Sequence, residues 1–171
     1  MADIVNVSRR GFLKGTGAAT AFVLGAHLVP RGFVSEAHAQ GAVAQPNLFV
    51  KIASDGHVTI TCSRIEMGQG VRTGIPMILA DELEADWDRC SIWQAPGDET
   101  KYDPAGKDGQ NTDGSRSTRH HLDVMRQLGA SARYTLEMAA AKQWGVNIQE
   151  VYAKNHRVYH SGTGKSVDFG A

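Results

Sequence analysis

The sequence predicts an α+β domain in which two helices pack on a mixed sheet of short strands. Short runs that alternate apolar and polar residues, rich in Val, Ile and Thr, predict the strands. Two longer segments repeat apolar residues every three or four positions, which predicts helices. The predicted order over residues 47–171 is β-β-α-β-loop-α-β-β, and helices of this length on a mixed sheet form an α+β or mixed α/β layer. With 171 residues, the chain is long enough for one domain of ordinary size.

The first half of this order contains three strands and one helix. Residues 47–53 and 57–63 alternate as strands, and the Gly-containing turn between them predicts a hairpin. A helix is predicted from Val71 to Trp87, with Pro76 either in the first turn of its regular part or at a kink. Its apolar face consists of residues 71, 75, 78, 79 and 83. The third strand is predicted over residues 89–94.

The second half begins with a long connection. Residues 95–114 are twenty turn formers, and a connection of this length in a compact domain is usually a binding loop or disordered. A long helix is predicted from Ser115 to about Trp144. Its predicted apolar face consists of Leu122, Met125, Leu128, Ala132, Leu136 and Ala139. Two weaker strands are predicted at residues 148–153 and 157–160, and no further element is predicted after them.

Charge and cysteine content exclude several classes of function. The chain has 18 basic and 18 acidic side chains, so electrostatics favour neither nucleic acid nor an acidic membrane surface as a partner. The only cysteines are Cys62 and Cys90, with no C-x-x-C, which excludes a cysteine-ligated iron–sulfur cluster or zinc knuckle within the chain. Two buried free thiols are favoured over a disulfide, because a protein that folds before export does so in a reducing compartment.

The first 39 residues have the pattern of a twin-arginine signal peptide. Residues 8–14 read S-R-R-G-F-L-K, and a weakly apolar stretch rich in Gly and Ala follows over residues 15–29. Residues 37–39, Ala-His-Ala, form a small-x-small cleavage site, so the mature chain is expected to begin at Gln40 and to start with a linker over residues 40–46. The predicted partner is the twin-arginine export machinery and the predicted location is the periplasm. Membrane association through an uncleaved signal stays open.

The first candidate site is Gly68-Gln69-Gly70, between a strand end and a helix start. Glycine lets a ligand approach the backbone closely, and a helix start offers unpaired N–H groups. The Gln69 amide adds donors and an acceptor suited to a cofactor. An ordinary tight turn explains the spacing equally well. Glu66 resembles a catalytic base by position, but a carboxylate that caps the turn is the favoured interpretation.

The second candidate site is Gly114-Ser115-Arg116-Ser117, at the start of the long helix. Hydroxyls, a guanidinium and helix-start N–H groups together suit a phosphate. Plain capping by Asp113, Ser115 or Ser117 is the alternative, and it stays open. A serine hydrolase is disfavoured because the G-x-S-x-G elbow is absent. The adjacent His120 and His121 are predicted to be an exposed pair.

Four motifs in order carry a resemblance to a known family. They are E-M-G-Q-G at 66–70, A-D-E-L at 80–83, Q-A-P-G-D at 94–98 and D-G-S-R-S at 113–117. Together with the twin-arginine start, they resemble the large subunit of the molybdenum hydroxylases of the xanthine oxidase family. The similarity is greatest to the group that contains isoquinoline 1-oxidoreductase beta subunits and exported aldehyde dehydrogenases.

This resemblance implies a molybdopterin cofactor, usually in its cytosine dinucleotide form. Its dithiolene binds molybdenum, so no side chain need ligate the metal. By the matched motifs, Gly68, Gln69 and Gly70 would approach the pterin. Gly114, Ser115, Arg116 and Ser117 would lie along its pterin or phosphate contacts.

The family's activity is to hydroxylate an aldehyde or N-heterocycle carbon with oxygen from water. Electrons leave through a small subunit with two [2Fe–2S] clusters, often to a cytochrome c. The base glutamate is expected beyond Ala171, so no catalytic residue is assigned here. The chain is expected to be an N-terminal fragment, with an incomplete molybdopterin-binding region over residues 47–171, that is inactive alone. The alternative is a small exported binding module, without enzymatic activity, for an anionic ligand at the helix start over Ser115 to Thr118.

Overall fold

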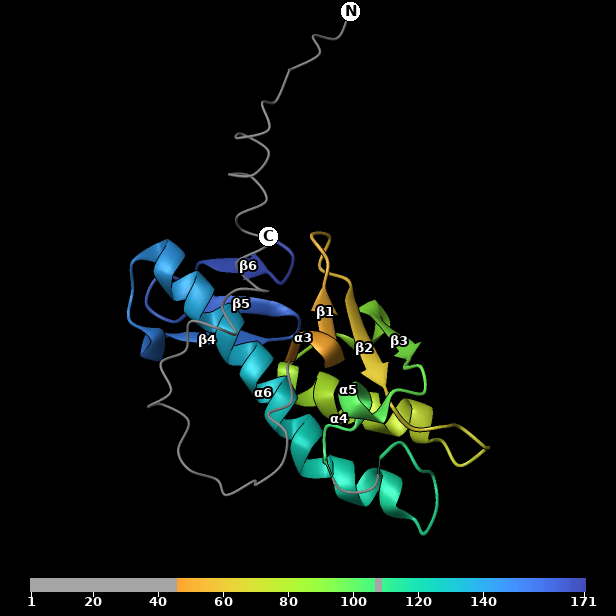
Figure 1. Cartoon of the computed structure of the whole chain (residues 1–171). Helices are drawn as coiled ribbons and strands as arrows, with labels where there is room; N and C mark the ends of the chain where they lie inside the picture. The colour runs from red at the N-terminus through yellow and green to blue at the C-terminus, as the bar shows by residue number, and fades with distance from the viewer. Residues whose placement is uncertain (1–45, 107–108) are drawn as a thin grey trace, which may run out of the picture.

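The computed structural model describes residues 46–106 and 109–171. The predicted signal peptide and almost all of the predicted linker lie outside the described residues. Within the described part, two small sheets flank a long helix, α6, Arg116–Trp144 (Figure 1). The predicted α+β class is confirmed. None of the helices in 46–106 and 109–171 is both long and apolar enough to cross a membrane.

The first sheet is mixed and sets up the edge on which the candidate site lies. Its strands are β1, Val50–Ile52, β2, Val58–Cys62, and β3, Cys90–Gln94, in that order. β1 and β2 form the predicted antiparallel hairpin, whereas β2 and β3 are parallel. Cys62 at the end of β2 is paired with Gln94 at the end of β3, so both strands end at the same edge of the sheet.

Two helices bury the apolar face of this sheet. The helix α4, Val71–Leu83, buries residues 71, 75, 79 and 83 of its predicted face and packs closely along α6. The helices approach so closely at Gly129 that a Cβ there would lie 2.5 Å from the Leu79 carbonyl oxygen. Burial of such residues from the two helices and the sheet supplies most of the favourable free energy of folding. The core is therefore one continuous cluster centred between α4, α6 and β2.

The second sheet is antiparallel and packs against the C-terminal half of α6 (Figure 1). Its strands are β4, Val151–Lys154, β5, Arg157–His160, and β6, Ser166–Asp168. Two short 3₁₀ helices, Trp87–Arg89 and Ile148–Glu150, precede β3 and β4.

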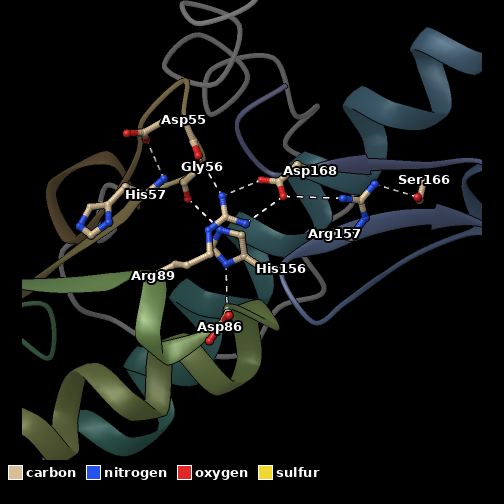
Figure 2. A network of polar contacts seen from close by, with 9 residues as sticks. All are labelled: Asp55, Gly56, His57, Asp86, Arg89, His156, Arg157, Ser166 and Asp168. Atoms are coloured by element: carbon tan, nitrogen blue, oxygen red, sulfur yellow. Dashed lines mark hydrogen bonds and ion pairs between the residues drawn. The ribbon is translucent and has the colours of Figure 1, made fainter.

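A polar network joins the second sheet to the β1–β2 hairpin, as Figure 2 shows. The Asp86 N–H donates to His156 Nδ1 at 3.0 Å, so Nε2 carries the proton and donates to the Gly56 carbonyl at 2.8 Å. His156 is only 1% exposed, and its backbone is left-handed with φ 67°. Beside it, the Arg89 guanidinium donates to both carboxylate oxygens of Asp168, at 2.8 and 3.0 Å. The two sheets are thus joined through side chains rather than through a shared strand ladder.

The observed elements differ from the predicted ones at five places. A strand was predicted at residues 148–153, but residues 148–150 form a 3₁₀ helix and β4 follows it. The described part of the chain starts with a short helix, α3, Pro46–Phe49, where a strand was predicted from residue 47. Another short helix, α5, Glu99–Tyr102, interrupts the connection over residues 95–114. β6 is an additional strand, paired with β5. The helix α4 ends at Leu83 instead of Trp87, because Glu84 adopts a left-handed conformation and its N–H bonds back to the last turn.

The buried face of α6 is rotated from the predicted one at both ends. Met125, Leu128 and Ala132 are buried as predicted, but Leu122 is 41% exposed and Ala139 is exposed. Ser117, His121, Ala140 and Ala141 are buried instead. The reason is that α6 packs on α4 near its start and on the second sheet near its end, so no single apolar stripe describes its 29 residues.

Candidate functional site

Both candidate turns lie at the same end of the molecule, away from the second sheet (Figure 1). The segment 64–70 leaves β2, and the segment 109–115 leads into α6. They are connected at their bases, because the Ile65 N–H donates to Thr112 Oγ1 at 3.1 Å. The structure thus brings the two predicted sites to one edge, where the parallel strands β2 and β3 end.

The Glu66 side chain organises the first turn. Its carboxylate accepts the N–H groups of Gly68 at 2.7 Å and of Gly70 and Arg72 at 2.9 Å. These backbone hydrogen bonds, foremost those from Arg72 and Gly70, lower the pKa of Glu66. The capping interpretation of Glu66 is confirmed by this geometry. Unpaired N–H groups were expected at this helix start. That expectation is corrected, because the Gly70 and Arg72 N–H groups donate to the Glu66 carboxylate.

The two glycines of this turn need their residue type for conformational reasons. Gly68 has φ 100° and Gly70 has φ 78°, in the region that disfavours other residues. A Cβ on either glycine would meet no atom within 4 Å, so the space beside the turn is open. The backbone of this turn is therefore accessible to a flat ligand at close range.

The Gln69 side chain closes the turn on itself. Its Oε1 accepts the Met67 N–H at 2.6 Å, and its Nε2 donates to the Ile65 carbonyl at 2.9 Å. The amide still has a second N–H and a further lone pair, and the residue is exposed. Gln69 can therefore contact a ligand only with the half of its amide that the turn does not use.

The second turn presents its helix start differently. Gly114 and Ser115 are consecutive left-handed residues, with φ 51° and 56°, and both are exposed. Ser115 is the N-cap of α6, but its side chain makes no capping hydrogen bond. The Arg116 N–H donates to the Asp113 carbonyl at 3.0 Å, and Ser115 supplies no side-chain acceptor to the other N–H groups at the start of α6. An anion placed beside Ser115 would meet these N–H groups and the positive end of the helix dipole.

The remaining two residues of this motif have other partners. Arg116 donates to the Asp113 carboxylate through Nε at 3.1 Å and through Nη2. Ser117 is 7% exposed and lies on the buried side of α6. Of the four predicted residues, Gly114 and Ser115 are thus the ones that face open solvent.

The two adjacent histidines are not an exposed pair, and that prediction is wrong. His121 is fully buried, with its Nε2 3.4 Å from Ser63 Oγ, whereas His120 is half-buried. Burial and the nearby positive charge of Arg64 lower the pKa of His121 to about 4, so its ring is neutral at pH 7. It packs under the first turn rather than beside a ligand, because its place in α6 directs it towards the end of β2.

Three polar residues that were not predicted as site residues hold the base of the first turn. Gln94, Gln110 and Thr112 hydrogen-bond to the backbone of residues 62–65. Gln94 lies within a quoted motif, but the other two lie in a connection where neither periodicity nor motif distinguishes them. Only the folded path of residues 109–115 brings them to β2.

Both cysteines are free thiols, as predicted, although Cys90 is half-buried rather than buried. Burial raises the pKa of Cys62, and burial together with the Asp86 carboxylate raises the pKa of Cys90 to about 11. Both are therefore protonated at neutral pH and are poor nucleophiles.

An open pocket of about 480 Å³ lies at the opposite end of α4 from the first turn. Three carboxylates line it, those of Asp81, Glu84 and Asp86, together with Ala85 and Asn155. These acidic groups would repel an anionic cofactor, so the pocket is not a candidate for its phosphates. Within residues 46–106 and 109–171, no group of three or more His, Cys, Asp or Glu side chains could hold a metal ion.

Comparison with known proteins identifies the family. Residues 7–171 match the molybdopterin cofactor-binding domain family. The match spans nearly the whole chain, and this chain therefore belongs to that family.

Two curated relatives extend the comparison. The chain is 36% identical over 170 residues to the isoquinoline 1-oxidoreductase subunit beta of Brevundimonas diminuta, covering 98% of this chain and 22% of that protein. It is 34% identical over 127 residues to the "Membrane-bound aldehyde dehydrogenase [pyrroloquinoline-quinone]" of Gluconacetobacter polyoxogenes, covering 74% of this chain and 15% of that protein. The chain thus spans about a fifth or less of the length of these relatives.

Solved structures share the fold. The quinoline 2-oxidoreductase of Pseudomonas putida 86 matches 71% of this chain and 15% of its own, with a TM-score of 0.52 and 21% identity. The reconstituted CO dehydrogenase of Oligotropha carboxidovorans matches 71% of this chain and 14% of its own, with a TM-score of 0.57 and 23% identity. The resemblance to molybdenum hydroxylase large subunits is therefore confirmed, and the alternative of a non-enzymatic binding module has no support in these comparisons.

Proposed function

We propose that this chain supplies one wall of the cofactor site in an exported molybdenum hydroxylase, which oxidises an aldehyde or N-heterocycle carbon with oxygen from water. The observation that carries the proposal is the pairing of two unlike turns at one edge of the fold. One has open backbone at Gly68 and Gly70, and the other has an uncapped helix start at Ser115. The bound molybdopterin would supply the redox chemistry of this reaction.

The residues fit a flat, anionic group. In our proposal, Gly68, Gln69 and Gly70 contact the pterin, because the absence of Cβ atoms leaves room for a ring against the backbone. Gly114 and Ser115 hold a phosphate through the N–H groups at the start of α6, and Arg116 and Ser117 support this contact. The phosphate belongs at α6 rather than α4, because Glu66 already acts as the anion at the start of α4.

Arg116 would have to exchange its partner to bind the phosphate. It pairs with Asp113 on an exposed surface, and such ion pairs stabilise a protein little. A phosphate with two negative charges can therefore compete for the same guanidinium.

The finer parts of the proposal concern the form of the cofactor, the partners and the location. We infer the cytosine dinucleotide form, a small subunit with two [2Fe–2S] clusters and a cytochrome c as the electron acceptor. The S-R-R-G-F-L-K pattern and the A-H-A site support a signal peptide over residues 1–39 and a periplasmic location. The base that assists the reaction, and the pocket for the small-molecule substrate, would be contributed by residues outside this sequence.

Chemical analysis of the native protein tests the proposal. The protein should be purified with its natural partners, and its molybdenum, pterin and nucleotide contents measured per chain. We expect one molybdenum, one pterin and one cytidine nucleotide. A folded protein that contains pyrroloquinoline quinone, or no cofactor, would contradict the proposal.

A further inference from the structure

The backbone that links β2 to the first turn is buried beyond the end of its strand ladder. Ser63 is 3% exposed and Arg64 is fully buried. Buried carbonyl groups require hydrogen-bond donors. The Cys62 carbonyl accepts the Ala95 N–H at 2.9 Å, and side chains supply further donors. Gln94 Nε2 donates to the Cys62 carbonyl at 3.1 Å and to the Arg64 carbonyl at 3.3 Å. Gln110 Nε2 donates to the Ser63 carbonyl at 3.3 Å.

Two residues of the segment that leads into α6, Gln110 and Thr112, contact this backbone. Gln110 donates at the same time to the Pro96 carbonyl, at 2.9 Å. Thr112 Oγ1 accepts the Ile65 N–H at 3.1 Å. Ser115 follows Thr112 by three residues, a span of about 10 Å at most. The base of the first turn is thus attached directly to the approach to the second turn.

The first turn has many internal hydrogen bonds beyond this base. Glu66 binds the N–H groups of Gly68, Gly70 and Arg72, and Gln69 bridges Met67 and Ile65. These hydrogen bonds fix the residues of the turn relative to one another. Its orientation is therefore determined by α4 on one side and by residues 63–65 on the other.

We propose that Gln110 and Thr112 are positioning residues that couple the two turns, so that the orientation of Gly68–Gly70 depends on the path of residues 110–115. The inference deepens the proposed function, because it makes the two halves of one cofactor site interdependent. The coupling itself does not require that the cofactor be molybdopterin.

A set of matched variants of the native protein tests the coupling. Thr112→Val keeps the shape of the side chain but removes the acceptor of the Ile65 N–H, whereas Thr112→Ser keeps the acceptor. Gln110→Ala removes the donor to Ser63. Thr135→Val and Gln127→Ala are the controls, since both residues lie further along α6, away from the base of the first turn.

Hydrogen–deuterium exchange of residues 67–72 is the first readout, because none of these amides bonds to Thr112 or Gln110. We expect exchange about three- to tenfold faster in Thr112→Val and in Gln110→Ala, the factor that corresponds to one lost hydrogen bond. Thr112→Ser and both controls should exchange like the native protein. Pterin and molybdenum retained per folded chain should fall in Thr112→Val and recover in Thr112→Ser.

Two outcomes would overturn the inference. One is that the amides of residues 67–72 exchange at the same rate in Thr112→Val and Gln110→Ala as in the native protein. The other is loss of cofactor in Thr112→Val without faster exchange there, since that would place the effect at the helix start alone. A native protein without pterin or molybdenum would contradict the proposed function, yet the exchange measurement would still decide the coupling.

A measurement on the unmodified protein covers the case in which the variants do not fold. Removal of the cofactor from the native protein should speed exchange in residues 67–72 and in residues 110–118 together. A change confined to one of the two segments would also overturn the inference.

Discussion

Glu66 illustrates how one side chain fixes the backbone of a turn. Its carboxylate accepts the N–H groups of Gly68, Gly70 and Arg72, which keeps two left-handed glycines in place. A motif glutamate beside a cofactor turn invites assignment as a catalytic base. Its lowered pKa makes it a poor base, and its hydrogen bonds give it a structural role.

Substitution of Glu66 should loosen the turn without unfolding the protein. We expect faster exchange of the Gly68, Gly70 and Arg72 amides in Glu66→Ala, and an intermediate effect in Glu66→Gln, which keeps one acceptor oxygen. In the native protein the folded pKa is depressed, so the stabilisation is present above the ordinary glutamate pKa of about 4.3 and is lost as pH falls through the lower folded pKa. Exchange that is equal in all three proteins would contradict this role.

His121 should make the stability of the protein depend on pH in the acid range. Its pKa falls from an ordinary value of about 6.5 to about 4 in the folded state, so between these values the unfolded chain binds a proton that the folded chain does not. The free energy of unfolding should decrease as pH falls from 6.5 to 4, by roughly 3 kcal/mol from this residue.

Urea unfolding at several pH values measures this effect. His121→Phe removes the titrating group at similar volume, so its stability should vary less over this range than that of the native protein. His57→Phe, at a half-buried site on the β1–β2 hairpin, is the control. Equal pH dependence in the native protein and in His121→Phe would refute the assignment.

At the scale of elements, the close approach of α4 and α6 depends on Gly129. A Cβ there would lie 2.5 Å from the Leu79 carbonyl oxygen and 2.9 Å from Glu82 Cβ. Gly129→Ala should force the helices apart and destabilise the protein by about 1–3 kcal/mol.

The matched control for this change is Gly74→Ala in α4. A Cβ at Gly74 meets no atom within 4 Å, so the helix propensity of alanine should raise stability by up to about 1 kcal/mol. Thermal unfolding of both variants decides between the two effects. A Gly129→Ala protein as stable as the native one would show that the helices can separate at no cost.

The burial pattern along each helix or strand explains which of them could be predicted from the sequence. β2, α4 and β5 were predictable because a single pattern of burial runs along each of them. The buried residues are 58, 60 and 62 in β2, 71, 75, 79 and 83 in α4, and 158 and 160 in β5. α6 was predictable as a helix, but not its buried face, because two different neighbours cover its two ends. The burial of His121 follows from this geometry and has no signal in local sequence.

In the candidate site, the turns were predictable and their supports were not. Glycines at positions 68, 70 and 114 indicate left-handed backbone directly, and all three have positive φ. Gln110 and Thr112 act over about 47 positions of sequence, on Ser63 and Ile65. No local sequence pattern indicates a contact between residues so far apart in the chain. Only the folded structure brings them together.

At the scale of the whole molecule, His156 joins the second sheet to the rest of the fold. His156→Asn keeps a residue that tolerates left-handed backbone, but its shorter side chain cannot reach both Asp86 and Gly56. We expect the free energy of unfolding to fall by about 2–4 kcal/mol, since the buried Gly56 carbonyl and the partly buried Asp86 N–H lose their partner. Exchange should also become faster at residues 53–57. His57→Asn is the control, and a stability equal to that of the native protein would contradict this role.

The central claim is that an anionic cofactor binds at the uncapped start of α6, and Ser115→Asp tests it most directly. Aspartate is a favourable N-cap and tolerates left-handed backbone, so the protein should fold with equal or greater stability. Its negative charge should repel the cofactor phosphate, and Ser115→Asn is the neutral control. The measurement is molybdenum bound per folded chain of the native protein and of both variants. The account predicts a loss of about tenfold or more in Ser115→Asp only; equal molybdenum in all three proteins would contradict it.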